Sequence, residues 1–461
     1  MGINNCQTCL EKQLKIDELK EEIDRLRQAL RRQKRKATEG LFGSSTPSGK
    51  LPVKPNSLEK EDKGKPGARP GHKGVGRKRL QAGPDVPVVE ISPEPADCPI
   101  CGGELRDKGY QEREVLESRP VKAERIVYRL PKKYCPHCRK TFKAQAPGVL
   151  PRSLYGNQLI ANAVVMHYLN GIPMGRICEQ TGVGAGSLVE IFHRLSGLLA
   201  GLPERLIEAY RAAPVKHADE TGWRTDGKNG YAWLFATPEI SVFQFGQNRS
   251  AKVPQAVFGK EQTPGVLVVD RYCAYNKIPC LIQYCYAHLL RDVTDLEKDF
   301  PDNPEIKTFV STVAPMLALA MGLRTQDISD KQFYGKAQKL EKDIKAAMES
   351  PAQHLGIRHI QNIFTENEGR LYHWAQDRRV PADNNLAERD LRPSVIARKT
   401  SFGSITDAGA KTRSVLTSIL QSMKKQGQDV PTTLKTALDK IATHTSQDPF
   451  LLLFPKYATI H

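Results

Sequence analysis

Three acidic residues in this chain stand where a folded protein could bring them together to bind a divalent cation. Asp219 ends an alternating segment that places Val215 and His217 on its own face of an expected strand. Asp270 ends the apolar run G-V-L-V-V-D at 265–270, which is typical of a strand buried on both faces of a parallel or mixed sheet. Glu388, far downstream, is the third acid, and carboxylates are the ligands that magnesium prefers.

Glu388 lies in the stretch P-A-D-N-N-L-A-E-R-D-L-R-P at 381–393, where an Asp or Asn cap is expected to open a helix that Pro393 ends. Residues four apart share a helix face, so Glu388 would face the metal with neighbours beside the phosphates of a substrate. Those neighbours are Asn384, Asn385, Arg389 and Arg392. Taken singly, each acid is better explained as a turn former or a salt-bridged helix surface residue. The hypothesis depends on all three occurring at the expected positions.

Four cysteines form two C-x-x-C pairs in tight turns: Cys98 with Cys101, and Cys135 with Cys138. Four thiolates match the tetrahedral geometry of zinc, and a closed four-cysteine shell leaves no open position for catalysis. The pattern predicts a structural zinc ribbon over 86–150. Unpaired core cysteines are the alternative, and His137 could replace one thiolate. A third pair, Cys6 and Cys9, has no second pair nearby, so we expect no metal there.

The composition is that of a soluble globular protein with several structural units, because 461 residues exceed one ordinary domain. The 69 Lys and Arg against 51 Asp and Glu give a net charge of +18, which favours a polyanionic partner. The N-terminus lacks the apolar core of a signal peptide, and the apolar run at 316–321 is too short to span a bilayer. We therefore expect a cytoplasmic protein without a membrane partner, in which thiols stay reduced.

The N-terminal part of the chain divides into a heptad-patterned helix at 1–36 and a linker at 37–85 rich in Gly, Pro, Ser and Lys. The helix is either a dimerising coiled coil or an amphipathic helix packed on its own chain. Four basic residues among Gly and Pro end the linker: Lys65, Arg69, Lys73 and Arg77. Such an arm could follow a DNA backbone or lie in a minor groove, or it could be a solvated linker.

Residues 151–212 read as three helices with a tight turn before the last, which a capping box at Ser187 and Glu190 is expected to start. The arrangement resembles a helix-turn-helix that binds DNA, and an ordinary helical subdomain fits nearly as well. Three strands, a helix and two further strands follow in 213–291. A helical insertion is expected at 292–380, the Glu388 helix with the rest of the core at 381–405, and a helical tail without assigned function at 406–461.

The motifs as a set are more specific than any one of them. They are H-A-D-E-T-G-W at 217–223, V-V-D-R-Y at 268–272, C-Y-A-H-L-L-R at 285–291 and N-N-L-A-E-R-D-L-R-P at 384–393, together with the linker G-L-F-G-S-S and the segment Y-L-N-G-I-P. Nearly the whole chain resembles a DDE transposase of the IS-sixty-six family of bacterial insertion sequences. The departures are Tyr286, where a Trp is common, and the tail at 449–461, which matches only loosely.

This resemblance implies a multi-domain α+β protein with a ribonuclease-H-like catalytic core. Asp219, Asp270 and Glu388 match the family's catalytic acids, which would hold magnesium or manganese for DNA cleavage and strand transfer. Cys285 and His288 match a C-x-x-H signature. Further expected DNA contacts are His288, Arg291 and Lys399, although His288 could equally support the acids. The supporting roles of His217 and Glu220 stay open.

The partners implied are double-stranded DNA, as element ends and target, and a second copy of the chain in a homodimer or higher oligomer. Small accessory proteins are a further partner class that the family often encodes. The protein would be bacterial and cytoplasmic, and associated with the nucleoid when bound to DNA. Two other functions remain open: a non-catalytic DNA-binding regulator or domesticated transposase, and a nuclease or resolvase that only hydrolyses DNA.

Overall fold

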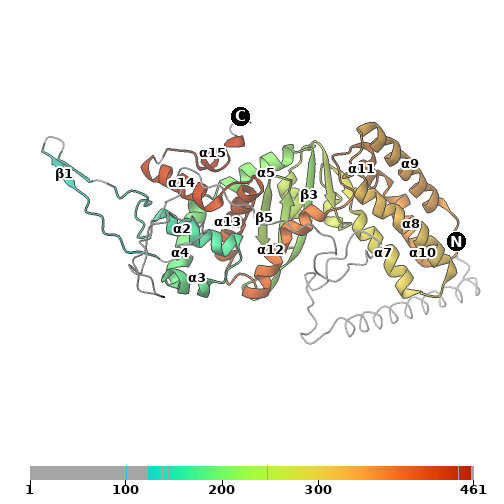
Figure 1. Cartoon of the computed structure of the whole chain (residues 1–461), viewed down its shortest axis with the longest axis horizontal. Coiled ribbons are helices and arrows are strands. Elements are labelled where there is room, and N and C mark those ends of the chain that lie inside the picture. The colour runs from blue at the N-terminus through green and yellow to red at the C-terminus, as the bar shows by residue number, and fades with distance from the viewer. Residues whose placement is uncertain are drawn as a thin grey trace, which may run out of the picture. The chain divides into compact units, whose positions relative to one another are not determined.

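A computed structural model describes residue 100 and residues 123–136, 139–143, 145–246, 248–444 and 446–457 (Figure 1). The chain divides into two compact units, Glu59–Lys122 and the combination of Met1–Leu58 with Ala123–His461. The predicted coiled coil, linker and basic arm lie outside the described residues, as do Cys6, Cys9, Cys98, Cys101 and Cys138. Apart from Ile100, the structure below is that of the second unit.

A five-stranded mixed sheet forms the centre of this unit, in the order β5-β4-β3-β6-β7. In this sheet β3, β4 and β5 pair antiparallel. β6 pairs parallel with β3, and β7 pairs parallel with β6. The strands are β3 (Val215–Thr225), β4 (Lys228–Ala236), β5 (Ser241–Gly246), β6 (Val266–Val269) and β7 (Leu281–Tyr284). A mixed sheet with flanking helices agrees with the α+β class expected from the sequence, and every residue of β6 is buried as its apolar run predicts.

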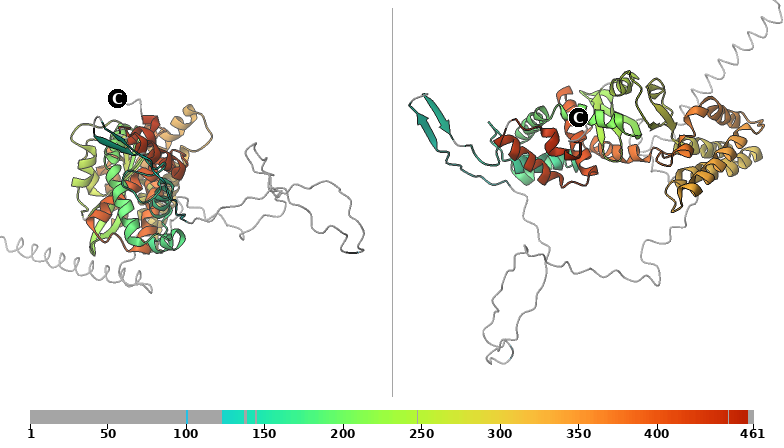
Figure 2. Two further views of the ribbon diagram at one scale, coloured as in Figure 1. Left: turned by 90° about the vertical axis from the view of Figure 1, so that its left-hand side faces the viewer. Right: turned by 90° about the horizontal axis from the view of Figure 1, so that it is seen from above.

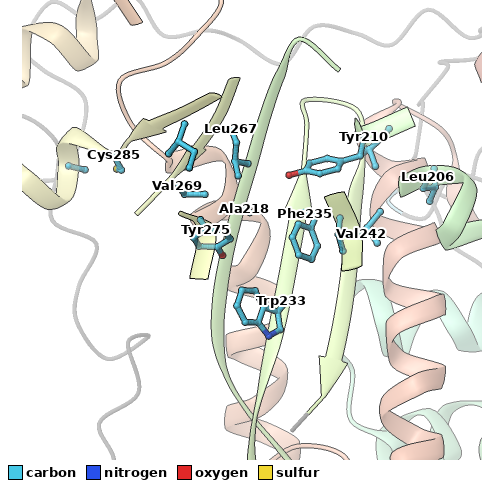
Figure 3. Close-up of a cluster of buried hydrophobic side chains, with 14 of the residues drawn as sticks. Leu206, Tyr210, Ala218, Trp233, Phe235, Val242, Leu267, Val269, Tyr275 and Cys285 are labelled. Carbon is cyan, nitrogen blue, oxygen red and sulfur yellow. The ribbon is translucent and has the colours of Figure 1, made fainter. Parts of the chain in front are cut away.

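Helices cover both faces of the sheet. On one face, Tyr210 of α5 (Leu202–Ala212) packs among Phe235 and Val242, and its ring meets Phe235 at 5.9 Å between centroids (Figure 3). On the other face, α12 (Asn385–Ser401) buries Ala387 and Leu391 against β4 and β5. The acid-bearing strand β3 is therefore sandwiched, and α12 is held firmly beside it.

α12 continues through Pro393 to Ser401, so the expectation that Pro393 ends this helix is wrong. Proline has no N–H to bond the carbonyl four residues earlier, which here belongs to Arg389. Burial of Leu391 and Ala397 on either side of Pro393 offsets the lost bond, and residues up to 401 therefore share the helix of Glu388.

The region before the sheet is helical, as expected, but differs in one boundary. α4 (Ala185–Leu198) begins directly after Gly184, so Ser187 lies inside the helix and the capping box predicted at Ser187 and Glu190 is wrong. The turn before α4 contains Gly182 with φ of 70°, a conformation that favours glycine. The other helices here are α2 (Asn157–Val164), the π-helix η2 (Val165–Leu169) and α3 (Met174–Thr181).

The segment between β7 and α12 is also helical, and α8 packs beside α7 and α9 in it (Figures 1 and 2). By length and composition α8 could span a membrane, with a mean hydropathy of 1.6 over its apolar window, although the run at 316–321 alone is short. Its buried stripe of Ile306, Val310 and Leu317 is that of a core helix. These helices are α7 (Tyr286–Asp299), α8 (Pro304–Leu323), α9 (Asp330–Glu349), α10 (Leu355–Glu366) and α11 (His373–Gln376).

The remaining elements are short or C-terminal. A separate two-stranded sheet pairs β1 and β2 antiparallel, with Cys135 opposite Lys140. The remaining bounds are β1 (Lys132–Cys135), β2 (Lys140–Lys143), α6 (Lys252–Phe258), η3 (Cys273–Tyr275), η4 (Glu368–Arg370), α13 (Asp407–Lys425), α14 (Val430–Thr443), α15 (Pro449–Leu453) and η5 (Pro455–Tyr457).

Three serines of α13 bind the outer edge of the sheet, and we call them the serine ladder. An edge strand exposes unpaired N–H groups, which must find partners when they are buried. Serines four apart on a helix face meet alternate residues of β5. The bonds run from the N–H of Ser241 to Ser422 Oγ (3.0 Å), from Phe243 to Ser418 Oγ (2.8 Å) and from Phe245 to Ser414 Oγ (3.0 Å).

We expect Ser418→Ala to destabilise the protein by about 1–3 kcal/mol, because the buried N–H of Phe243 would lose its partner. Urea unfolding followed by circular dichroism measures the change. Ser311→Ala on the exposed side of α8 is the matched control, and it should change stability by less than about 0.5 kcal/mol. Equal effects of the two substitutions would show that the serine ladder does not stabilise the edge.

Candidate active site

β3 and β6 bring the two aspartates side by side, although only Asp270 lies at a strand end: β6 ends at Val269, whereas β3 continues past Asp219 to Thr225. The strands are parallel, and His217 pairs with Val268 in their register. Asp219 and Asp270 each lie two residues further on, so they share a face at the same end of the sheet. Backbone N–H groups hold both carboxylates: Glu220 donates to Asp219 Oδ1 (2.8 Å) and Tyr272 donates to Asp270 Oδ1 (3.0 Å).

Asn384, the residue before α12, fixes the start of this helix against β3. Its side-chain Oδ1 accepts a bond from His217 Nδ1 (2.9 Å), and its Nδ2 donates to the carbonyl of Ala218 (2.8 Å). Its backbone N–H donates to Cys285 Sγ (3.1 Å). Asn384 is 1% exposed, so all of these bonds are buried. Glu388 follows in the first turn of α12, where the helix dipole favours a negative charge.

The acids interact electrostatically. Burial raises the pKa of Asp219 well above its ordinary value, and the charges of Glu220, Asp270 and Glu388 raise it further. Among the described residues, no Lys or Arg forms an ion pair with Asp219, Asp270 or Glu388. The three carboxylates thus lack a counter-charge of the kind that a bound cation supplies.

A magnesium ion fits the chemistry of these donors, because it retains several waters and takes one or two carboxylates rather than a full protein cage. Within the described ranges, no group of three or more His, Cys, Asp or Glu is already arranged to hold a metal ion. The raised pKa of Asp219 shows that its ionised form is disfavoured as the side chains stand. A divalent cation between the carboxylates would offset that repulsion.

Glu220 and His217, whose roles the sequence left open, have partners of their own. The Glu220 side chain is 2% exposed and pairs with Arg249 Nη2 (2.7 Å), while Tyr275 donates to its other oxygen (2.8 Å). Burial lowers the pKa of His217 to about 4, so it is neutral at physiological pH and serves as the donor to Asn384. Both residues position β3, and neither faces the site as an unpaired ligand.

The C-x-x-H motif lies against the acids. Burial lowers the pKa of His288, as does the charge of Arg291, whereas Asp270 and Glu388 raise it. Nδ1 of His288 is buried without a partner in the described part of the chain. Cys285 is fully buried, and burial raises the pKa of its thiol to about 12. Cys285 is therefore structural, while the His288 ring interacts electrostatically with Asp270 and Glu388 and has a nitrogen without a described partner.

The expected DNA contacts differ in position. Asn384 is 1% exposed and its amide binds His217 and Ala218, so its predicted phosphate contact does not fit the structure. Arg389, Arg392 and Lys399 are exposed along α12, and Asn385 is partly exposed on the same helix. Arg291 is half-buried near His288. The remaining four predicted contacts lie outside the described residues: Lys65, Arg69, Lys73 and Arg77.

Sequence patterns missed two arginines that border the site. Arg249 neutralises Glu220 and lies over the ring of Tyr272 at 4.1 Å, and a basic residue directly after the third strand was the available signal. Arg398 of α12 binds the carbonyl of Gly222, while its Nε and Nη2 are buried without a partner among described atoms. The expectation of a helix end at Pro393 concealed Arg398.

Comparison with known proteins identifies the family of this chain. A model of the family described as "Transposase IS66 family" matches residues 152–412, more than half of the chain and all of the sheet with its three acids. A second model, "zinc-finger binding domain of transposase IS66", matches residues 95–139, which include all four cysteines of the predicted ribbon. This chain belongs to the IS66 transposase family.

Curated relatives come from Sinorhizobium fredii (strain NBRC 101917 / NGR234). Uncharacterized protein y4jD is 25% identical, over 77% of this chain and 76% of the relative. Uncharacterized protein y4qI is 26% identical, over 76% of this chain and 72% of the relative. The similarity covers most of each chain, so it extends well beyond the individual motifs.

We expect Asn384→Ala to lower the stability of the protein by about 2–4 kcal/mol, because it leaves buried groups of His217 and Ala218 unpaired at about 1–3 kcal/mol each. Asn385→Ala, at the partly exposed neighbour, should stay within about 0.5 kcal/mol. Denaturant unfolding measures both. A stable Asn384→Ala protein with weakened DNA binding would instead identify Asn384 as a DNA contact.

Proposed function

We propose that this chain is a DDE transposase that binds insertion-sequence ends and catalyses metal-dependent 3′-end cleavage and strand transfer. The observation that carries the proposal is the position of Asp219, within β3, beside Asp270 at the end of the parallel strand β6, with Glu388 presented by α12 and no counter-charge among described residues. Family membership supports transposition as the overall process. The chemistry and the residue roles are our proposal.

The catalytic core is proposed to be ribonuclease-H-like. Three antiparallel strands followed by two parallel ones, in the spatial order 3-2-1-4-5 by position along the chain, support this assignment. The acids belong to the first and fourth strands, and the glutamate to a helix that packs on the face of the sheet they share. The helical segment between β7 and α12 would then be an insertion into the core.

Asp219, Asp270 and Glu388 would hold magnesium or manganese. Bound divalent metals stabilise charge on the attacking and leaving oxygens of an in-line phosphodiester displacement. The chain's own residues would position the substrate: His288 borders the acids, and Arg389, Arg392 and Lys399 are exposed along α12, where they could bind phosphates. Such contacts orient a strand without reading its sequence, and they weaken as salt rises.

The N-terminal modules would recognise DNA and assemble the complex. Cys98, Cys101, Cys135 and Cys138 are proposed to hold one structural zinc, which the zinc-finger match supports. We further propose that the basic arm and α3 with α4 contact DNA, and that the chain forms a homodimer or higher oligomer. Small accessory proteins would be further partners. The protein would act in the bacterial cytoplasm, on the nucleoid. None of these requires a membrane.

The catalytic proposal predicts that purified protein with magnesium cleaves labelled element ends and joins them to target DNA. Asp219→Asn and Glu388→Gln should each reduce cleavage by about 10²–10³-fold, because metal stabilisation of the transition state is worth several kcal/mol. Gel analysis of 3′ ends and of joined products measures both steps. Equal activity of parent and variants would refute the active-site assignment.

Two controls separate the alternatives. DNA affinity should be the same in parent and variants, and magnesium should raise the unfolding temperature of the parent more than that of Asp219→Asn. Cleavage without joining would identify a nuclease or resolvase, while specific binding without cleavage would identify a regulator.

The zinc proposal predicts one zinc per chain, lost on Cys98→Ser because three thiolates no longer close the tetrahedral shell. Atomic absorption on dialysed protein measures zinc content. Cys178→Ser is the matched control, since Cys178 is a partly buried free cysteine of α3 and should leave zinc unchanged. Full zinc content in the Cys98→Ser protein would remove Cys98 from the site.

A further inference from the structure

A pocket of about 180 Å³ lies where the Y-L-N-G-I-P segment meets α12 and α13. It is far larger than a single water molecule needs. Its rim reaches the surface, because Asn170 is exposed and Ile396 is 57% exposed. The polar side chains that line it include His167, Asn170, Ser394, Arg413 and Thr417.

Arg413 brings a positive charge into this pocket without a carboxylate to balance it. The residue is 8% exposed, and its guanidinium lies 5.0 Å from the ring centroids of both Tyr168 and Trp223. Among the described residues, no Asp or Glu forms an ion pair with Arg413. A buried charge is costly unless it is paired, and arginine does not lose its proton to avoid that cost. The guanidinium of Arg413 therefore has no negative charge in this pocket to balance it.

His167 orients Arg413 but supplies no negative charge. Its Nδ1–H donates to the carbonyl of Ile172 (3.0 Å), which leaves Nε2 to accept a bond from Arg413 Nη2 (3.2 Å). Burial and the charge of Arg413 together lower the pKa of His167 to about 4, so the imidazole is neutral at physiological pH. The histidine, like the two aromatic rings, holds the guanidinium in place.

Thr417 is a second, independent sign of a missing partner. It is 3% exposed, it lines the same pocket, and its Oγ1 has no hydrogen-bond partner within the described part of the chain. Buried hydroxyls are rarely left unpaired, and each one costs free energy. A buried cation and an unpaired buried hydroxyl in one pocket both suit a ligand with several acceptor oxygens and a negative charge.

We propose that this pocket binds a phosphate group, with Arg413 supplying the charge and Thr417 a hydrogen bond. The source that the position favours is the backbone of a DNA strand. Ser394 in the pocket wall is six residues after Glu388 on α12, or about 9 Å along the helix. A strand held at the acids could therefore place a nearby phosphate here. This second step rests on the proposed function, whereas the phosphate site does not.

The first experiment measures thermal unfolding of the full, zinc-loaded chain in inorganic phosphate and in chloride at equal ionic strength. Phosphate should raise the unfolding temperature of the parent, as a ligand specific to the folded state does. Arg413→Met should be at least as stable as the parent in chloride, because an unpaired buried charge is gone, and should lose the rise. Lys342→Met, an exposed change on α9 with the same loss of charge, should keep it.

If Arg413 were only a structural cation between two rings, phosphate would not stabilise the parent specifically through this residue. Arg413→Met would then lose the same stability in both salts, or the parent would show no rise with phosphate, and either result overturns the site. Thr417→Val provides a second test in case Arg413→Met does not fold, because valine has nearly the same shape as threonine. It should fold and weaken phosphate binding by about 3- to 10-fold, the worth of one hydrogen bond. Unchanged phosphate affinity in Thr417→Val would likewise refute the site.

The second experiment measures DNA affinity by fluorescence anisotropy at several salt concentrations. Arg413→Met should weaken binding and reduce the slope of log K against log salt by about 1, while Lys342→Met should change neither. If Arg413→Met loses the phosphate effect but keeps parental DNA affinity and slope, the pocket takes a free anion and the DNA assignment is wrong. Asp219→Asn should retain both pocket effects, so failure of the catalytic proposal is distinguishable from failure of this one.

Discussion

The geometry of the acidic site depends on one buried amide. Asn384 binds β3 through His217 and Ala218 and reaches the start of α7 through Cys285. β3, α7 and α12, which Asn384 precedes, bear or border all of the carboxylates. Because the amide is buried, each bond that it makes would leave a costly unpaired group if it were broken. The position of Glu388 relative to the two aspartates therefore follows from Asn384 rather than from contacts among the acids, which repel one another.

Much of the central fold could be predicted from local pattern. The apolar run of β6 and the alternation before Asp219 identify strands that place two acids together. The role of Asn384 could not be predicted, because its partners His217 and Ala218 are 167 and 166 residues away and an Asn before a charged helix reads as a surface cap. Pro393 misled for a related reason: the packing of α12 on the sheet outweighs the local tendency of proline to end a helix.

The charges of α12 differ in whether they form ion pairs. The acids of the site have no ion-pair partner among the described residues, and Arg389 and Arg392 of the same helix point to solvent. Lys425 and Asp390, by contrast, form a largely buried pair that joins α13 to α12. This pair balances two charges inside the protein, unlike Arg413, which has no carboxylate partner among the described residues. The net charge of +18 favours a polyanionic partner for the whole chain.

The serine ladder links the length of a strand to the pitch of a helix. Four residues of α-helix advance about 6.0 Å and two residues of strand about 6.8 Å, so successive rungs drift apart by about 0.8 Å. Three rungs keep this mismatch within the tolerance of a hydrogen bond, and a longer series would not. β5, with 6 residues, is about as long as such a match allows. An inserted residue between Ser414 and Ser422 would rotate the serines that follow it by about 100° around α13. Those serines would then no longer face the N–H groups of β5.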